Sequence, residues 1–344
     1  MSHPDKTAFV IMGPETFKDD VRKTIRSVPL TFGNFEVKEK EFDKYLGDCL
    51  SSNGLSDSVD RTIKGREGTT KTAIMEVASL VNDLRMQAVG GILSGFDLWN
   101  LCIIPSLLNN CSTWTDISVK SLERLEELQN LFVRVLLRVP ITTPKVALLS
   151  ETGLLSMKHR IWQEKILLVM AILKMKKEVL SRRVLKEQLE NNYPGLGQEV
   201  RRICEELSIP NVTKSMVQKQ MLKRAILIHH CKEIKENMLT YKKLKNLVNE
   251  DNIKTKEYMK TMTVSNVRSN FRIRTNMLEL IGNMKGGHID IRCRACKKSG
   301  SKEDQSHVQN CQEYQDLKEG LDMFRDFDLI KFFRNVIIRM TQNK

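Results

Sequence analysis

A helical repeat of apolar residues runs through most of this chain. From Ser56 onward, apolar side chains recur every three or four positions, a spacing that places them along one face of an α-helix. The clearest stretch begins at Ser118, stops at Pro140, and carries six such residues: Leu122, Leu125, Leu128, Phe132, Val135 and Leu136. Thr143-Pro144 and Gly153 bracket a shorter helix, because proline favours the start of a helix and glycine its end. The pattern predicts a mainly helical fold.

Further helices are expected on the same grounds. One runs from Ser56 toward Gly90-Gly91, and the others cover residues 98–108 with a kink at Pro105, 157–176, 179–192, 197–207, 214–238 and 254–281. Near Pro210 the dense apolar patterning gives way to basic helices, which marks a boundary between domains.

Strand signals occur only in the first fifty residues. Short runs at residues 7–12, 32–37 and 42–50 are each followed or interrupted by glycine-containing turn signals. Residues 15–28 between the first two runs carry one apolar stripe at helical spacing. The expected fold class is therefore mainly α, with a small α+β part at the N-terminus.

The charge of the chain is strongly positive. Its 344 residues include 56 Lys and Arg against 42 Asp and Glu, a formal net charge of +14 that attracts nucleic acid first and anionic membranes second. The longest apolar run, Ile166 to Leu173, is far shorter than the roughly 20 residues of a membrane span. No secretory signal is visible. We expect an intracellular protein, in the nucleus or cytoplasm, with no membrane association.

Three of the eight cysteines are clustered with a histidine near the C-terminus. Cys293 and Cys296 are separated by two residues, His307 follows after ten, and Cys311 after three more. This set supplies the four ligands of a closed tetrahedral zinc site, which is typical of a structural ion. The spacing predicts one structural zinc per chain, against the alternative of unrelated thiols in a polar stretch.

The remaining cysteines do not have metal spacing. Five are scattered and are expected to be small core residues: Cys49, Cys102, Cys111, Cys204 and Cys231. His229-His230 beside Cys231 is not expected to chelate an ion, because adjacent residues of a helix point about 100° apart.

Basic residues form two clusters at helical spacing. The first holds Lys219, Lys223 and Arg224, and the second holds Lys256, Lys260, Arg268, Arg272 and Arg274. Cations one helical turn apart can line one face for phosphate contacts, although a solvated charged face remains the alternative for either cluster. No catalytic constellation is recognisable, and Asp19-Asp20 is expected to lie on the surface of an amphipathic helix.

The order of several short motifs resembles the region downstream of the catalytic core in non-LTR (LINE-type) retrotransposon reverse transcriptases. The motifs are Lys6-Thr7, Lys44-Tyr45-Leu46-Gly47, Arg66, Gly90-Gly91, Ile104 to Leu108, Trp114, Leu125 to Gln129, Pro140, Thr143-Pro144 and Glu151-Thr152-Gly153. The Cys/Cys/His/Cys set, followed by Tyr314, is similar to the zinc knuckle near the end of those polyproteins.

The resemblance implies a domain organisation and further site residues. It implies a palm remnant at residues 1–54, a helical thumb and connector at 55–210, a basic helical linker region at 211–285, and a zinc knuckle with C-terminal helices at 286–344. Lys6 would belong to the last palm motif. Lys44, Tyr45, Leu46 and Gly47 would belong to the primer-grip hairpin that contacts nucleic acid.

The resemblance also sets expectations about activity. The family is an RNA-directed DNA polymerase, but its catalytic aspartates lie upstream of the position that corresponds to Met1, so this chain is expected to be a truncated form, inactive by itself. The expected partners are RNA or DNA through backbone contacts, and a separate polymerase core or element RNA, with no small-molecule substrate. Alternatives are a zinc-stabilised protein-interaction module without nucleic-acid function, or a chain that complements a separate catalytic subunit.

Overall fold

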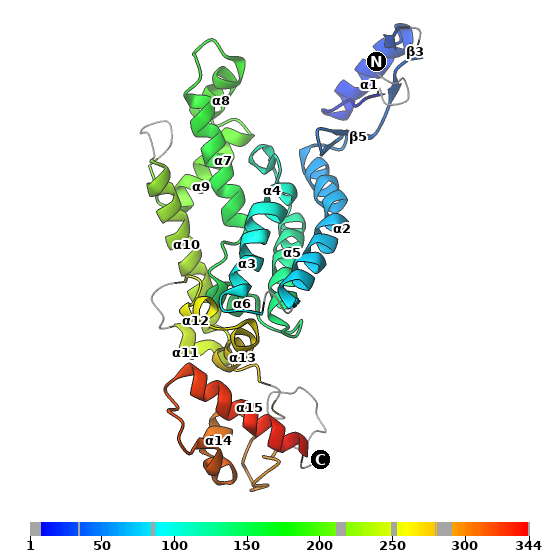
Figure 1. Ribbon diagram of the computed structural model, residues 1–344. Helices are drawn as coiled ribbons and strands as arrows, with labels where there is room; N and C mark the ends of the chain where they lie inside the picture. Colours follow the sequence, from blue (N-terminus) through cyan, green and yellow to red (C-terminus); the bar gives the residue numbers. More distant parts are fainter. Residues whose placement is uncertain are drawn as a thin grey trace. The chain divides into compact units, whose positions relative to one another are not determined.

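The computed structural model describes residues 8–33, 35–83, 87–210, 218–248, 253–278, 280 and 291–342. It is mainly helical, with short strands confined to the N-terminal part, which confirms the expected fold class at that level (Figure 1). In the described part of the chain, no helix combines the length and the apolar character that crossing a membrane requires.

The first strands enclose one helix and one hairpin. Strand β1 (Ala8–Phe9) pairs in parallel with β4 (Lys38–Glu39), and α1 (Glu15–Ser27) lies between them in the sequence. Strands β2 (Thr31–Phe32) and β3 (Phe35–Glu36) pair antiparallel with each other. The prediction of one strand at 32–37 was therefore wrong, because the chain reverses after β2, where Gly33 adopts a φ of +62° that glycine tolerates.

The predicted strand at residues 42–50 is also a hairpin. Strands β5 (Phe42–Tyr45) and β6 (Asp48–Ser51) pair antiparallel, with Tyr45 opposite Asp48. The two residues between them, Leu46 and Gly47, have φ angles of +50° and +89°. Positive φ at both central positions is the geometry of a tight two-residue hairpin turn, so the alternating pattern folds back on itself.

Two compact units make up the chain, and each collects three stretches of sequence. The first comprises Met1–Ile74, Trp99–Gln129 and Leu155–His230, and the second comprises Met75–Leu98, Asn130–Leu154 and Cys231–Lys344. Neither unit coincides with one of the four predicted segments. Three helices contribute residues to both units: α2 (Leu55–Asn82), α5 (Val119–Leu137) and α10 (Lys219–Leu239).

Pro105 perturbs its helix in a defined way. A π-helical turn, η3 (Trp99–Ile103), precedes the short helix α4 (Ile104–Leu107) that contains this proline. Proline has no amide hydrogen, and its ring clashes with the carbonyl group four residues earlier, so the local hydrogen bonds widen to the π pattern. The expected kink is thus a π turn, and a 3-10 turn, η4 (Cys111–Thr113), follows.

Helices α7 (Met157–Leu173), α8 (Leu180–Asn191) and α9 (Leu196–Glu206) form a core within the first unit. They pack together with the N-terminal part of α10 through buried side chains that include Ile166, Val169, Leu185, Leu189, Val200, Ile203, Leu222 and Ile226. The apolar positions that predicted these helices therefore lie inside the unit, as amphipathic helices require.

The second unit contains α3 (Gly91–Leu98), α6 (Lys145–Thr152), η5 (Lys242–Leu244), α11 (Lys245–Val248), α12 (Glu257–Thr261) and α13 (Val264–Arg274). The prediction of a single helix at residues 254–281 was wrong, because the helical backbone is interrupted at Met262, between α12 and α13. The Gly90 N–H donates to the Met262 carbonyl oxygen at 3.1 Å, and Val89 forms an isolated antiparallel bridge with Thr263. These tertiary hydrogen bonds take the place of helical ones. The last elements are α14 (Gln305–Asn310), η7 (Gln312–Lys318) and α15 (Asp326–Gln342).

Gly153 occupies a position that no other residue should fit. Its φ is +66°, and a Cβ atom added there would lie 2.3 Å from the backbone nitrogen of Thr255. Gly153→Ala is expected to lower the free energy of unfolding by about 2–4 kcal/mol, through strain and overlap together.

Urea denaturation measures that loss, and Gly65→Ala is the matched control. Gly65 is an exposed glycine of α2, and a Cβ atom added there would meet no other atom within 4 Å, so alanine should be neutral or stabilise by up to about 1 kcal/mol. Equal effects of the two substitutions would contradict the assigned role of Gly153.

Candidate metal centre

A short antiparallel ladder carries the first two cysteines. The Cys293 N–H donates to the Ser301 carbonyl oxygen at 2.9 Å, and the Glu303 N–H donates to the Ile291 carbonyl oxygen at 2.9 Å. The turn between the two stretches includes Cys296 and reverses through Gly300, whose φ is +79°. Both thiols therefore belong to one tight turn.

The start and end of helix α14 supply the other two ligands. Asp304 caps the helix by accepting a hydrogen bond from the His307 N–H at 2.9 Å, which places His307 in the first turn. Cys311 is the residue at which the helix ends. A helix of six residues thus presents both ligands toward the turn that holds the cysteine pair.

The four ligand atoms have the spacing of a tetrahedral shell. Cys293 Sγ lies 3.9 Å from Cys311 Sγ, Cys296 Sγ lies 3.4 Å from His307 Nε2, and all four atoms are within 4.8 Å of one another. Zinc bonds of about 2.3 Å to sulfur and about 2.0–2.1 Å to nitrogen imply ligand separations of about 3.8 Å and about 3.6 Å in a tetrahedron. The cluster can hold a metal ion, and its donors are compatible with zinc.

The thiols of the cluster differ in acidity. The backbone N–H of Lys298 donates to Cys296 and lowers the pKa of this thiol to about 6, assisted by the Ser301 hydroxyl. Burial raises the pKa of Cys311 to about 12, although the Glu313 N–H donates to its sulfur. In each case the donor is the amide two residues after the cysteine.

A small core surrounds the cluster within residues 291–342, which we name the C-terminal module. Glu303 is fully buried and accepts hydrogen bonds from Arg294, at 2.8 Å from its backbone N–H and 2.7 Å from its guanidinium group. Tyr314 is buried in η7, which packs against α15, and Phe332 and Phe333 of α15 are buried too. The buried Glu303 carboxylate is thus well hydrogen-bonded, whereas Tyr314, Phe332 and Phe333 are the large side chains of this small core.

The residues predicted to contact nucleic acid near the N-terminus surround the β5–β6 turn. Lys44 is exposed, and the side chains of Tyr45 and Leu46 are 65% and 75% exposed beside Gly47. Lys6 lies outside the described residues. On α10, the predicted cluster of Lys219, Lys223 and Arg224 is exposed to solvent.

The second basic cluster is not one continuous cationic face. Lys256 precedes α12, and Lys260 lies in the last turn of that helix, paired with Glu257, whereas the three arginines belong to α13. Arg274 pairs with the buried Glu151 at 2.8 Å, and Arg268 is only 9% exposed. The third arginine, Arg272, donates to the Arg138 carbonyl oxygen. Helical spacing alone cannot indicate these tertiary partners.

A buried histidine network in the first unit was missed by the sequence analysis. His159 is fully buried, its Nε2 lies 2.9 Å from His229 Nδ1, and its Nδ1 lies 2.7 Å from the Ser156 hydroxyl. Burial lowers the pKa of His159 to about 2, with a further contribution from His230, so the ring is neutral. No local spacing links His159 to a residue on another helix, and the network could not be foreseen.

The fold and the cluster define a mainly helical protein with a Cys3His cluster that could hold a metal ion. No protein-family model matches the chain, no curated protein matches its sequence, and no solved structure matches its fold. The resemblance to retrotransposon reverse transcriptases therefore stays a prediction.

Proposed function

We propose that this protein binds nucleic acid through backbone phosphates and folds its C-terminal module around one structural zinc ion. The observation that carries the proposal is the Cys3His cluster, whose ligand spacing matches a tetrahedral shell in a chain of net charge +14. Four protein ligands close such a shell and leave no position for water or substrate, so the zinc would act in folding and not in catalysis.

The surroundings of Arg66 support the proposed origin from a LINE-type reverse transcriptase. The Arg66 guanidinium donates to the Gly47 carbonyl oxygen at 3.0 Å and to the Leu107 carbonyl oxygen at 3.1 Å, and it lies 5.6 Å from the Trp114 ring. It also forms a 2.7 Å ion pair with Asp48. Three other motifs of the resemblance thus meet around the side chain of Arg66.

This arrangement suits a contact with a nucleic-acid strand. Arg66 anchors the turn of the β5–β6 hairpin, and the tip leaves the Tyr45 ring and the Lys44 ammonium exposed. An exposed ring can stack on a base, and a neighbouring cation can pair with a phosphate. Lys219, Lys223 and Arg224 on α10 would add phosphate contacts in the same unit.

Salt dependence of oligonucleotide binding tests the proposal. With about four phosphate contacts, affinity for a single strand should fall about fifty-fold between about 50 mM and about 200 mM salt, because binding releases counterions. Fluorescence anisotropy of a labelled oligonucleotide measures the slope of log affinity against log salt concentration, which we call the salt slope. An affinity that does not change with salt would contradict the proposal.

A triple substitution locates the cations that pair with phosphate. Alanine at positions 219, 223 and 224 should reduce the salt slope by about 2, because each phosphate that is no longer neutralised lowers the slope by about 0.7. The control is alanine at Lys174, Lys176 and Lys177, three exposed cations outside the predicted clusters, which changes the net charge equally. A similar fall of the salt slope in both triple variants would show that oligonucleotide binding depends only on the total charge of the protein.

One observation favours the alternative of a protein-interaction module. Phe324 is 99% exposed and Phe327 is 57% exposed, so two aromatic side chains near the start of α15 face solvent. If oligonucleotide binding is absent and the chain forms a stoichiometric protein complex that Phe324→Ala disrupts, this alternative replaces the proposal.

A further inference from the structure

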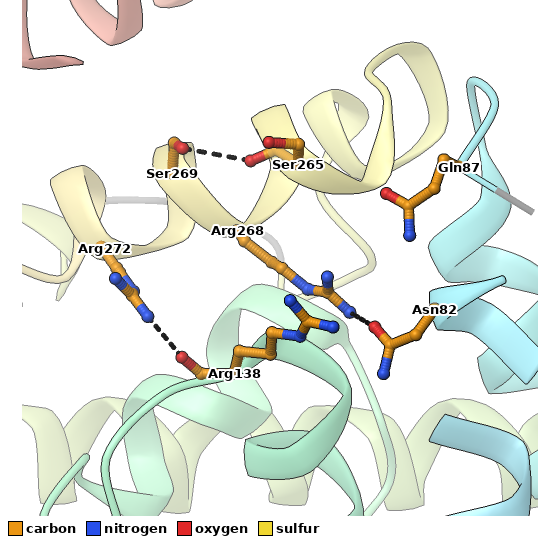
Figure 2. Close-up of a pocket in the computed structure, with 7 residues that line it drawn as sticks. All are labelled: Asn82, Gln87, Arg138, Ser265, Arg268, Ser269 and Arg272. Atoms are coloured by element: carbon orange, nitrogen blue, oxygen red, sulfur yellow. Dashed lines mark hydrogen bonds between the residues drawn. The ribbon is translucent and has the colours of Figure 1, made fainter. Parts of the chain in front are cut away.

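A hollow in the second unit is lined by arginines. It has a volume of about 420 Å³ and is lined by Asn82, Gln87, Arg138, Ser265, Arg268, Ser269 and Arg272 (Figure 2). Three of these seven residues carry a guanidinium group, the other four offer neutral polar groups, and none carries a carboxylate. Because positive charge converges and no lining residue that the structure describes is negative, the hollow suits an anion.

Hydrogen bonds hold two of the three guanidinium groups in place, those of Arg268 and Arg272. Arg268 donates from Nε and Nη2 to the Leu136 carbonyl oxygen at 3.0 and 2.9 Å, and its Nη2 also donates to Asn82 at 2.6 Å. Arg272 donates to the Arg138 carbonyl oxygen. Figure 2 shows the Arg138 side chain extending beside that of Arg268. Guanidinium groups that are already ordered can bind an anion with little further loss of side-chain entropy.

The electrostatics of the hollow favour an added negative charge. Burial lowers the pKa of Arg268 to about 10, and the positive charges of Arg138 and Arg272 contribute to that shift. An anion between these groups would offset both their mutual repulsion and the loss of hydration.

Two features nearby support a built site. Arg138 follows α5 with a φ of +52°, a position where glycine is the least strained residue, so an arginine there carries a conformational cost. On α13, the Ser265 and Ser269 hydroxyls, which belong to lining residues, accept hydrogen bonds from Arg334 at 2.9 and 3.4 Å, so a further positive charge lies next to the hollow without lining it.

We propose that this arginine hollow binds a phosphate dianion, either the terminal phosphate of a nucleic-acid strand or free inorganic phosphate. Forked guanidinium groups match the oxygen geometry of phosphate. A terminal phosphate carries close to two charges and is attached to only one chain, whereas an internal phosphodiester carries one charge and must enter with both neighbours. Binding of a strand's terminal phosphate rests on the proposed function, whereas binding of free phosphate does not depend on it.

Inorganic phosphate tests the hollow on the full-length, zinc-loaded chain. At constant ionic strength, about 10 mM phosphate should raise the thermal midpoint of unfolding by about 2–4 °C relative to chloride. Arg138→Gly should abolish this shift while the protein stays folded, because glycine suits the positive φ. No shift for the wild type, or an unchanged shift for Arg138→Gly, would overturn the proposal.

Two further variants test whether phosphate binds in the hollow and whether it needs a guanidinium group there. Arg325→Ala is the control, since it removes an exposed arginine of the same unit, paired with Asp322, and should keep the full phosphate shift. A loss of the shift in this variant would overturn the assignment to the hollow. Arg138→Lys keeps the positive charge but loses the bidentate hydrogen bonding of the guanidinium group, so it should weaken phosphate binding about tenfold.

Oligonucleotides with and without a 5′-phosphate distinguish the two sources. If the strand end is the ligand, the phosphorylated form should bind about tenfold more tightly, and Arg138→Gly should remove this preference. If inorganic phosphate binds but the two oligonucleotides do not differ, the ligand is free phosphate. If inorganic phosphate binds but neither oligonucleotide does, the proposed nucleic-acid function is refuted. The assignment of a phosphate site to the arginine hollow is then still supported.

Discussion

Cys296→Ser is expected to abolish zinc binding and to unfold the C-terminal module. Serine cannot replace the thiolate, and three remaining ligands would leave the shell open. A structural zinc contributes roughly 10–16 kcal/mol of apparent binding free energy at neutral pH, far more than the small core around Tyr314 and Phe332 can supply. Metal analysis of the pure protein should give one zinc per wild-type chain and none for the variant.

Controls separate loss of the metal from general damage. Cys102 is exposed, so the expectation that it is a core residue was wrong, and Cys102→Ser should keep one zinc because it changes a cysteine outside the cluster. His307→Cys should also keep it, because four thiolates form an accepted zinc shell. Limited proteolysis should cleave residues 291–342 of Cys296→Ser while the first unit resists. A wild-type protein without zinc, or a Cys296→Ser variant that retains it, would refute the assignment.

Glu151→Ala is expected to lower the free energy of unfolding by about 3–5 kcal/mol, because it leaves the Arg274 charge without its buried partner. Glu151 has no exposed surface and accepts hydrogen bonds from Arg274 at 2.8 and 3.1 Å and from the Tyr258 hydroxyl at 2.9 Å. Burial raises the pKa of Tyr258 well above its ordinary value, so this hydroxyl remains a donor. Urea denaturation of the zinc-loaded protein measures the loss.

An exposed ion pair in the same unit provides the comparison. Glu257 and Lys260 lie 3.0 Å apart, with side chains 73% and 45% exposed, so Glu257→Ala should cost no more than about 0.5 kcal/mol. Glu151→Gln, which keeps the shape but not the charge, should fall between the two. Similar losses for Glu151→Ala and Glu257→Ala would show that the buried pair does not hold α6 and α13 together.

Local patterns predicted the helices well, for a physical reason. Ser118 accepts the Ser121 N–H at 3.0 Å before α5, and Gly153 ends α6 with a positive φ. Caps, apolar stripes and glycine C-termini are interactions over a few residues, so the sequence displays them directly. The spacing of the zinc ligands is local in the same sense, because all four lie within nineteen residues.

Long-range contacts decided what these patterns could not. The break at Met262 depends on the backbone of Val89 and Gly90, and the partner of Arg274 lies 123 residues earlier at Glu151. A basic residue on a helix shows the same spacing whether it faces a phosphate, a carbonyl oxygen or a buried carboxylate. Only the fold distinguishes these environments.

The sequence by itself determined a mainly helical chain, a small N-terminal strand region, strong positive charge and four ligands at metal spacing. The tertiary structure alone decided that two expected strands are hairpins, that Arg66 joins distant motifs, and that Arg138, Arg268 and Arg272 surround one hollow. The reason is that capping, periodicity and ligand spacing act within a few residues, whereas burial and charge pairing depend on residues brought together by folding.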